Sequence, residues 1–239
     1  MEPIQLHGSV IFVAHVKTGY EERRAHISKM LCNSQFEWML DGDIADISPE
    51  RNARYFRADA HLTPSQKSCA LKHVLICREI VDRNLPGALV LEDDICLHDR
   101  FPVVFARSLA EIEQIDRPLI ANYEDTRLRF VPRSRREKGR VLYPGDRDRM
   151  TGCYYINRAG AEAVLREVDE NKIGLPADHF HKKLLNDGKL LYLWAQPTVA
   201  TQGSHNGLFR SAINSNKTSW TERKWLLLRA YKKLIYNLR

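Results

Sequence analysis

The chain has 239 residues, with 37 Lys plus Arg against 30 Asp plus Glu, so it carries a net charge of +7 at neutral pH. This length fits one domain or two small ones, and 44% hydrophobic residues exclude an intrinsically disordered chain. No apolar run approaches the roughly 20 residues that span a bilayer, so we expect no transmembrane helix. Residues 1–209 hold 29 basic and 29 acidic side chains, whereas residues 210–239 hold 8 basic and 1 acidic. The surplus charge therefore belongs to the C-terminal tail.

The cysteines indicate reduced thiols in a cytosolic protein. Their number is odd, and they form no C-x-x-C pair and have no His partner at zinc-finger spacing. Residues 1–16 lack a basic region and a small-residue cleavage site, so we predict a first strand there instead of a signal peptide.

Hydrophobic patterns predict strands and helices that alternate along the chain. The predicted strands lie at 9–14, 38–42, 88–91, 119–123, 150–156 and 190–194, and the helices at 20–32, 64–85, 102–115, 159–168 and 178–185. The clearest helix begins with Thr63 as N-cap, Pro64 in the first turn and Gln66 completing a capping box. The basic segment Arg127–Arg149 is predicted to be a long surface loop. The alternation predicts an α/β single domain with a mainly parallel sheet.

Three consecutive carboxylates, Glu92, Asp93 and Asp94, follow the wholly apolar strand at 88–91. In open α/β sheets, ligands bind outside the carboxyl ends of strands. Adjacent anions repel one another and are kept ionised by a divalent cation or by Lys and Arg partners. Carboxylate oxygens suit Mg²⁺ or Mn²⁺, and such a metal could hold a substrate diphosphate. The alternative is a solvated turn that caps the next helix, but attachment to a buried strand favours the metal site.

Other candidate residues lie in the second half of the chain. Asp178 stands at a predicted helix start, where it is either an N-cap or a general base. His179 and His181 are two residues apart and point apart on a helix, so they do not predict a metal pair. His205 follows a strand and is either a surface histidine or a fourth metal or phosphate contact. The phosphate-loop, nucleophile-elbow and dinucleotide motifs are absent, which disfavours P-loop kinases, α/β hydrolases and typical Rossmann dehydrogenases.

Short motifs between residues 9 and 213 occur in the order and spacing of a known family. They are Val10–Val13 followed by Arg23–Arg24, Leu62–Thr63 leading to Cys69–His73, Ala88–Asp94, Thr151–Ala161, Pro176–His179, and Gln196–Pro197 with Gln202–Ser204. Together they resemble glycosyltransferase family 25. Its members are lipooligosaccharide galactosyltransferases of bacteria and collagen galactosyltransferases of animals.

The resemblance implies a GT-A fold, an inverting mechanism and a nucleotide-sugar donor, most often UDP-galactose, with Mn²⁺ or Mg²⁺. The acids at 92–94 correspond to the family's D-x-D type metal motif, with Asp94 as the most direct ligand, and Asp178 is the candidate base. Such a metal neutralises the leaving diphosphate while the base deprotonates an acceptor hydroxyl. The residues expected to contact metal, donor or acceptor are Val13, Arg23, Arg24, Glu92, Asp93, Asp94, Thr151, Gly152, Tyr154, Asp178, His179, Gln202, Ser204 and His205. Exposed helix positions are the alternative for the two arginines.

Two departures from the family pattern concern the segment before the predicted metal motif. The family has G-E-I-G-C followed by Ser-His, whereas this chain has Ser65–Cys69 and then Lys72–His73. Should the family's acid contact donor or acceptor, the sugar specificity differs here. The replacement of Ser by Asn157 is milder, because both residues are good helix caps.

The tail Trp220–Arg239 predicts an amphipathic helix, which we treat as a unit of residues 214–239 beside a catalytic domain of residues 1–213. A helical wheel places Arg229, Lys232, Lys233 and Arg239 opposite an apolar arc of Trp220, Leu227, Leu228, Ala230, Tyr231, Leu234, Ile235 and Leu238. This is typical of an interfacial helix attracted to anionic lipid. The alternative is a helix packed on the domain.

These observations leave three hypotheses. The first is a metal-dependent glycosyltransferase that acts on a lipid-linked oligosaccharide of lipopolysaccharide type, in the cytoplasm at the inner face of the membrane, with galactose or a different donor sugar. The second is a nucleic-acid-binding protein that uses the Arg127–Arg149 loop and the tail; with only Phe130 and Tyr143 for stacking in that loop, we expect no nucleic-acid partner. The third is a catalytically silent binding module, which the intact acids at 92–94 disfavour.

Overall fold

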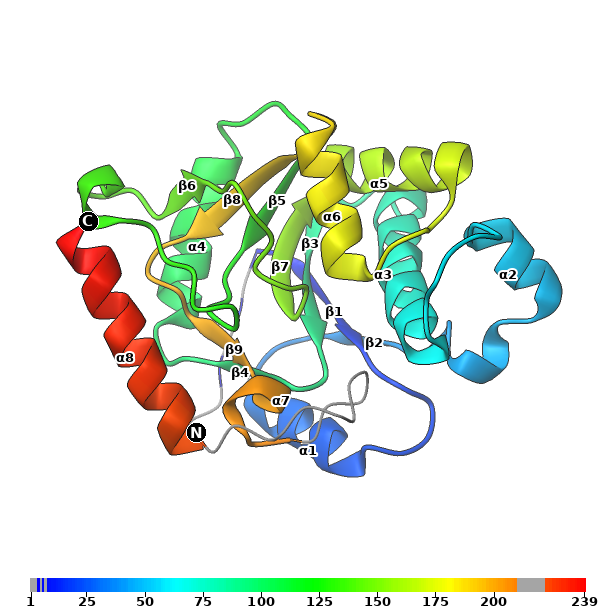
Figure 1. Cartoon of the computed structure of the whole chain (residues 1–239), viewed down its shortest axis with the longest axis horizontal. Helices are drawn as coiled ribbons and strands as arrows, with labels where there is room; N and C mark the ends of the chain where they lie inside the picture. The colour runs from blue at the N-terminus through cyan, green and yellow to red at the C-terminus, as the bar shows by residue number, and fades with distance from the viewer. Residues whose placement is uncertain (1–3, 5, 7, 210–221) are drawn as a thin grey trace.

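The protein is described by a computed structural model that covers residues 4, 6, 8–209 and 222–239. Its centre is a seven-stranded sheet in the order β2-β1-β3-β7-β5-β8-β6, with helices on both faces (Figure 1). The strands are β1 (Val10–Ala14), β2 (Glu37–Met39), β3 (Gly87–Glu92), β5 (Leu119–Asn122), β6 (Leu142–Pro144), β7 (Cys153–Asn157) and β8 (Leu191–Ala195). A separate two-stranded ribbon pairs β4 (Ile95–Leu97) with β9 (Ala200–Gln202).

Five strands of the central sheet run in one direction. β1 pairs in parallel with β2 and β3, and β5 pairs in parallel with β8, while β7 lies antiparallel between β3 and β5. Residues 123–152, between β5 and β7, contain the short strand β6 and no long crossover helix, and both β6 and β7 run opposite to the other five strands. The predicted α/β class is confirmed, and reversed strands β7 and β6 make the sheet mixed.

Helices cover the sheet on both faces because its central strands are apolar on both sides. One core cluster joins alternate strand residues such as Phe12 and Val90 to helices α3 (Pro64–Asp82), α5 (Arg158–Asn171) and α6 (Ala177–Asn186). The other joins residues such as Val13 and Leu91 to α1 (Glu21–Met30) and α4 (Phe101–Ile112). The remaining short elements are η1 (Ile44–Asp46), α2 (Pro49–Tyr55), η2 (Arg133–Arg135) and α7 (Gly203–Asn206).

The predicted helix starts at Thr63 and Asn157 are confirmed. The Thr63 hydroxyl accepts a hydrogen bond from the Gln66 amide at 3.2 Å, and the Gln66 side chain accepts one from the Thr63 amide at 2.9 Å. The Asn157 side chain accepts from the Gly160 amide at 2.8 Å. These bonds satisfy amides that have no partner within the helix, so they fix where α3 and α5 begin.

We predicted a long surface loop at Arg127–Arg149, but the structure buries several residues of this segment. It contributes the edge strand β6, whose Leu142 and Tyr143 are buried. Arg149 is fully buried, donates to the Ala195 carbonyl at 2.9 Å and stacks on the Trp194 ring at 4.5 Å. The basic composition concealed these inward-facing positions, and Arg149 is not available as a basic surface for nucleic acid.

Helix α8 (Glu222–Leu238) packs on the domain through its polar and aromatic side. Trp225 joins Phe130 in a small cluster. Arg229 Nε donates to Asp125 Oδ2 at 2.6 Å, and Arg229 Nη2 forms an ion pair with the same oxygen at 2.5 Å. Asp125 is wholly buried. The predicted apolar arc faces outward at Leu227, Tyr231, Leu234 and Leu238, whereas Trp220 lies outside the described residues. Of the described helices, none combines the length and apolarity that crossing a membrane requires.

Replacing Arg229 with Ala removes the charged partner of a buried carboxylate. We expect the free energy of unfolding to fall by about 3 kcal/mol, because Asp125 is then buried without a counter-charge. Urea unfolding followed by tryptophan fluorescence measures this difference. Arg223→Ala, an exposed position on the same helix, is the matched control and should change the value by less than about 0.5 kcal/mol. Equal losses in both variants would contradict the assignment.

Candidate active site

Two cavities meet at the carboxyl ends of β1 and β3. The first, here called the β1 cavity, has a volume of about 370 Å³ and is lined by the β1–α1 segment, the turn after β2 and one side of α3. The second, the α6 cavity, has a volume of about 300 Å³ and is lined by the start of α6, the β9–α7 segment and residues before β7. Cys69 and Glu92 line both cavities. One surface therefore offers two adjoining spaces with Glu92 between them; Asp93 lines the β1 cavity, and Asp94 lines neither cavity.

Asp93 is held by two groups from the segment that follows β1. Its Oδ2 lies 2.7 Å from His15 Nδ1, and its Oδ1 accepts from Arg23 Nη1 at 2.8 Å. Asp93 is 8% exposed and Arg23 5% exposed, so this is a buried ion pair. The contact fixes the β1–α1 segment against the end of β3, which shapes the wall of the β1 cavity.

Asp94 has one carboxylate oxygen without a hydrogen-bond partner. Its Oδ2 accepts from the Ser204 amide at 3.1 Å, whereas the buried Oδ1 has no such partner among the described residues. Burial raises the pKa of Asp94 to about 6, and the nearby Glu92 carboxylate adds to this shift. A bound cation would relieve both effects, so Asp94 is suited to hold one.

Glu92 connects three segments of the chain. Its Oε1 accepts from the Thr151 hydroxyl at 2.7 Å, and its Oε2 accepts from the Gln202 amide nitrogen at 3.0 Å. Gly152 lies beside this contact, and a Cβ there would come within 2.6 Å of the Gln202 side chain. The glycine therefore permits the close approach of Gln202 to Glu92.

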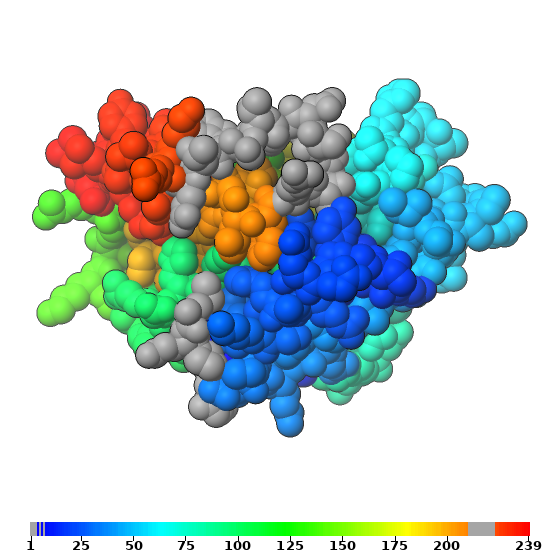
Figure 2. Space-filling model, turned by 90° about the horizontal axis from the view of Figure 1, so that it is seen from below, coloured from blue at the N-terminus to red at the C-terminus, as the bar shows by residue number. Residues whose placement is uncertain are grey.

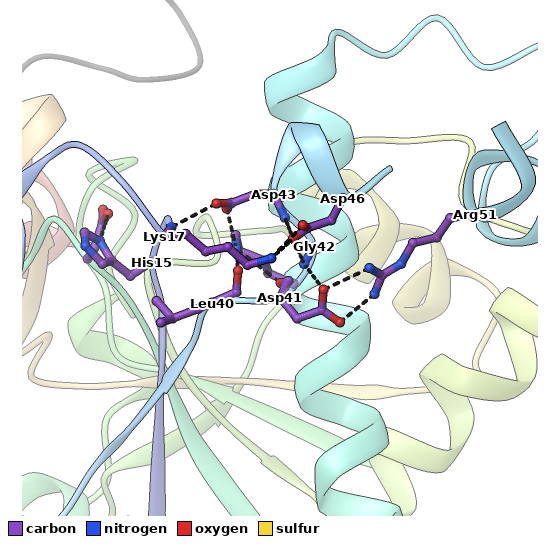
Figure 3. A network of polar contacts seen from close by, with 10 residues as sticks. His15, Lys17, Leu40, Asp41, Gly42, Asp43, Asp46 and Arg51 are labelled. Atoms are coloured by element: carbon purple, nitrogen blue, oxygen red, sulfur yellow. Dashed lines mark hydrogen bonds and ion pairs between the residues drawn. The ribbon is translucent and has the colours of Figure 1, made fainter. Parts of the chain in front are cut away.

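The turn after β2 contributes Asp43, Ile44 and Ala45 to the lining of the β1 cavity. Figure 3 shows the polar contacts that hold this turn. Asp43 accepts from the Lys17 amide at 2.8 Å and pairs with Lys72 Nζ at 2.8 Å. Lys72 also donates to the Leu40 carbonyl at 2.9 Å, and Lys17 pairs with Asp46 at 2.6 Å. Lys72, which departs from the family pattern, thus fastens this turn to α3.

Asp178 lies in the first turn of α6 but does not cap it, because the N-cap residue is Pro176 and no side chain caps the helix. Its Oδ2 accepts from Arg127 Nη2 at 2.9 Å. The side chain is 12% exposed and lines the α6 cavity together with His179. Arg127 orients the carboxylate and balances its charge, and the Asp178 carboxylate is thus presented to a ligand in this cavity.

The other predicted site residues divide into two groups. The α6 cavity is lined by Thr151, Gln202, Ser204 and His205. Val13 and Tyr154 do not line either cavity: Val13 is paired between β2 and β3, and Tyr154 is buried under the site with its hydroxyl 2.9 Å from His73 Nδ1. Arg24 stacks on the Trp38 ring at 5.3 Å and does not line either cavity.

His205 and the three acids do not form the compact ligand group that we expected. Among the described residues, the one group of three potential ligands whose atoms lie within 4.8 Å of one another consists of Cys69, His73 and Glu92.

No sequence motif indicated a role in the site for His15 or Arg127. His15 directly follows β1 at the carboxyl edge of the sheet, a position that is itself a signal for site residues; Arg127 was hidden among the many arginines of its segment.

Comparison with known proteins agrees with the motifs. The chain is 35% identical over 133 residues to procollagen galactosyltransferase 1 of Danio rerio, a match that covers 52% of this chain and 21% of that protein. The chain thus matches only about a fifth of this relative's length.

Two solved structures show weaker similarity. One is a Bacillus anthracis protein assigned as a glucose-1-phosphate thymidylyltransferase, with a TM-score of 0.40, 15% identity and coverage of 88% of this chain and 78% of that one. The other is the galactosyltransferase LgtC in complex with donor and acceptor sugar analogues, with a TM-score of 0.39, 12% identity and coverage of 93% and 95%. Scores this low support no conclusion about shared function.

The family pattern covers the part of the site that precedes β8. The model of glycosyltransferase family 25 (LPS biosynthesis protein) matches residues 10–181, a range that contains β1, the acids at 92–94 and Asp178. Because this match extends over more than half of the sequence, the chain belongs to glycosyltransferase family 25.

Proposed function

We propose that this protein transfers a hexose from a nucleoside diphosphate sugar to a hydroxyl group of a glycan, with inversion at the anomeric carbon. The observation that supports this most is the pair of cavities that adjoin at Glu92. One lies beside the acids that end β3, and the other contains Asp178. A donor bound in the β1 cavity and an acceptor bound in the α6 cavity would lie on opposite sides of Glu92.

The reaction follows from this placement. Asp178 takes the proton of the acceptor hydroxyl, whose oxygen forms the new bond to the anomeric carbon. The bond from that carbon to the phosphate oxygen breaks, and the diphosphate leaves with the electron pair. Attack from the side opposite the leaving group inverts the configuration. Arg127 holds Asp178 in position for this step through the 2.9 Å contact.

The donor side would take UDP-galactose, with Mn²⁺ or Mg²⁺. The β1 cavity opens at the ends of parallel strands β1 and β3, where α/β proteins bind nucleotides. Asp94 fits a hard divalent cation because its buried Oδ1 has no hydrogen-bond partner in the part of the chain that the structure describes. Such an ion supplies positive charge to the departing diphosphate. Asp93 holds Arg23 and His15 through its two oxygens.

The acceptor would be a lipid-linked oligosaccharide of lipopolysaccharide type, reached from the cytoplasmic face of the membrane. Helix α8 supports this, because its exposed apolar stripe of Leu227, Tyr231, Leu234 and Leu238 is accompanied by the exposed bases Arg223, Lys224 and Arg239. Apolar side chains flanked by bases suit an anionic lipid surface. We also propose that the chain has the GT-A type of fold, as its resemblance to the family implies.

Asp178→Asn should lower kcat by about 10²- to 10⁴-fold, because the amide cannot accept the acceptor's proton. Donor affinity should stay within about twofold of wild type, since Asp178 does not line the β1 cavity. Product formation from UDP-galactose and lipooligosaccharide measures turnover, and calorimetry measures donor binding. Asp187→Asn, just beyond the other end of α6, is the matched control. Normal turnover of Asp178→Asn would assign the base elsewhere.

Asp94→Asn should remove the effect of Mn²⁺ on donor binding. We expect at least about a 10-fold loss of UDP-galactose affinity in the presence of Mn²⁺ and no change in EDTA, because a carboxylate ligand is lost. Calorimetric titration with and without the ion provides the comparison. The exposed Asp99→Asn serves as control. An Asp94→Asn variant with the full Mn²⁺ enhancement would refute the assignment of this ligand.

The double variant Leu227→Gln, Leu234→Gln should bind anionic vesicles at least about 10-fold more weakly than wild type, because two exposed leucines no longer enter the lipid interface. Co-sedimentation with phosphatidylserine-containing vesicles measures this. Val103→Gln changes an exposed apolar residue on α4 and should leave binding unchanged. Equal vesicle binding by wild type and the double variant would rule out α8 as the membrane contact.

A further inference from the structure

Cys69, His73 and Glu92 form a cluster beneath the junction of the two cavities. Cys69 and His73 are one helical turn apart on α3 and therefore project from the same side of it. Glu92 approaches them from the end of β3. One potential ligand atom of each residue lies within 4.8 Å of those of the others. The function proposed above makes no use of Cys69 or His73.

His73 has a buried nitrogen that lacks a hydrogen bond. The residue is 2% exposed, and its Nδ1 lies 2.9 Å from the Tyr154 hydroxyl. Its Nε2 has no hydrogen-bond partner among the described residues, although it lies 3.4 Å from Glu92 Oε1. A buried polar atom without a hydrogen bond is costly. Here it points into the cluster, and Tyr154 orients the ring as an outer partner orients a metal-binding histidine.

The cluster is accessible to an ion from solvent. Cys69 and Glu92 line both cavities, so an ion can enter from either side. Any ion bound by the three residues would have a further coordination position open toward the junction of the cavities. This arrangement matches metal sites with three protein ligands and one exchangeable position.

We propose that Cys69, His73 and Glu92 bind a borderline-soft divalent cation of the Zn²⁺ type. A thiolate, an imidazole and a carboxylate suit Zn²⁺ and Co²⁺, whereas Mg²⁺ and Mn²⁺ prefer oxygen ligands. This ion is distinct from the hard cation proposed at Asp94, and its binding does not depend on glycosyl transfer. Tetrahedral bonds of about 2.0–2.3 Å place ligand atoms about 3.5 Å apart, so modest side-chain movement closes the cluster. Binding releases the thiol proton to solvent.

Titration of the full chain with Co²⁺ tests the site without reference to activity. We expect one Co²⁺ per chain to produce the visible bands of a tetrahedral ion together with a thiolate-to-metal charge-transfer band, both abolished by Zn²⁺. Cys69→Ser should lose the charge-transfer band. Cys32→Ser, which removes an exposed free thiol, should retain it. The absence of the band from wild type, or its persistence in Cys69→Ser, would overturn the proposal.

Two further measurements test the site even if Cys69→Ser fails to fold. Tyr154→Phe keeps all three ligands, so it should retain the charge-transfer band while weakening Co²⁺ binding about 10- to 100-fold through loss of the His73 contact. X-ray absorption of the wild-type chain with one equivalent of Zn²⁺ needs no variant. One sulfur at about 2.3 Å from the zinc supports the site, and a shell of nitrogen and oxygen alone overturns it.

Discussion

Three adjacent carboxylates at the end of a buried strand are the constraint on which the rest of the site depends. They cannot share one environment, because neighbouring charges repel and burial penalises each of them. The fold gives each a different partner: Arg23 and His15 for Asp93, neutral side chains for Glu92, and a backbone amide for Asp94. Segments distant in sequence are thereby drawn to one edge of the sheet. The site is the consequence of satisfying these three groups.

The same reasoning links the C-terminal helix to the site. Asp125 accepts from Arg229 of α8 and also from the hydroxyls of Thr198 and Thr201. Thr201 precedes Gln202, whose side chain holds Glu92. Figure 2 shows residues 200–209 on the molecular surface between α8 and the N-terminal part of the chain. The helix turns its polar side to this buried acid and leaves its apolar stripe outward, so the packed and the interfacial interpretations of the tail are compatible.

Much of this could be predicted from sequence where a local rule applied. The capping residues Thr63 and Asn157 fixed two helices, and the acids at 92–94 pointed to the sheet edge where the two cavities meet, because these signals act through near neighbours. The pairing of Asp93 with Arg23 and the burial of Arg149 depend on contacts between distant segments, which no local pattern encodes. The family resemblance named Asp94 as the most direct ligand but did not predict how the neighbouring acids are held: both oxygens of Asp93 contact His15 and Arg23, whereas the buried Asp94 Oδ1 has no hydrogen-bond partner among the described residues.

The residues that depart from the family pattern line different cavities, so each is expected to affect a different part of the site. Lys72 lines the β1 cavity and is tied to the turn at residues 40–43, so it stabilises a wall. Gln66 occupies the position of the family's acid and lines the α6 cavity. Glu and Gln complete a capping box equally well, so α3 begins in the same way with either residue. The exchange therefore removes one negative charge from the α6 cavity, whereas Ser65, Ser68 and Lys72, which stand where the family has Gly, Gly and Ser, line the β1 cavity.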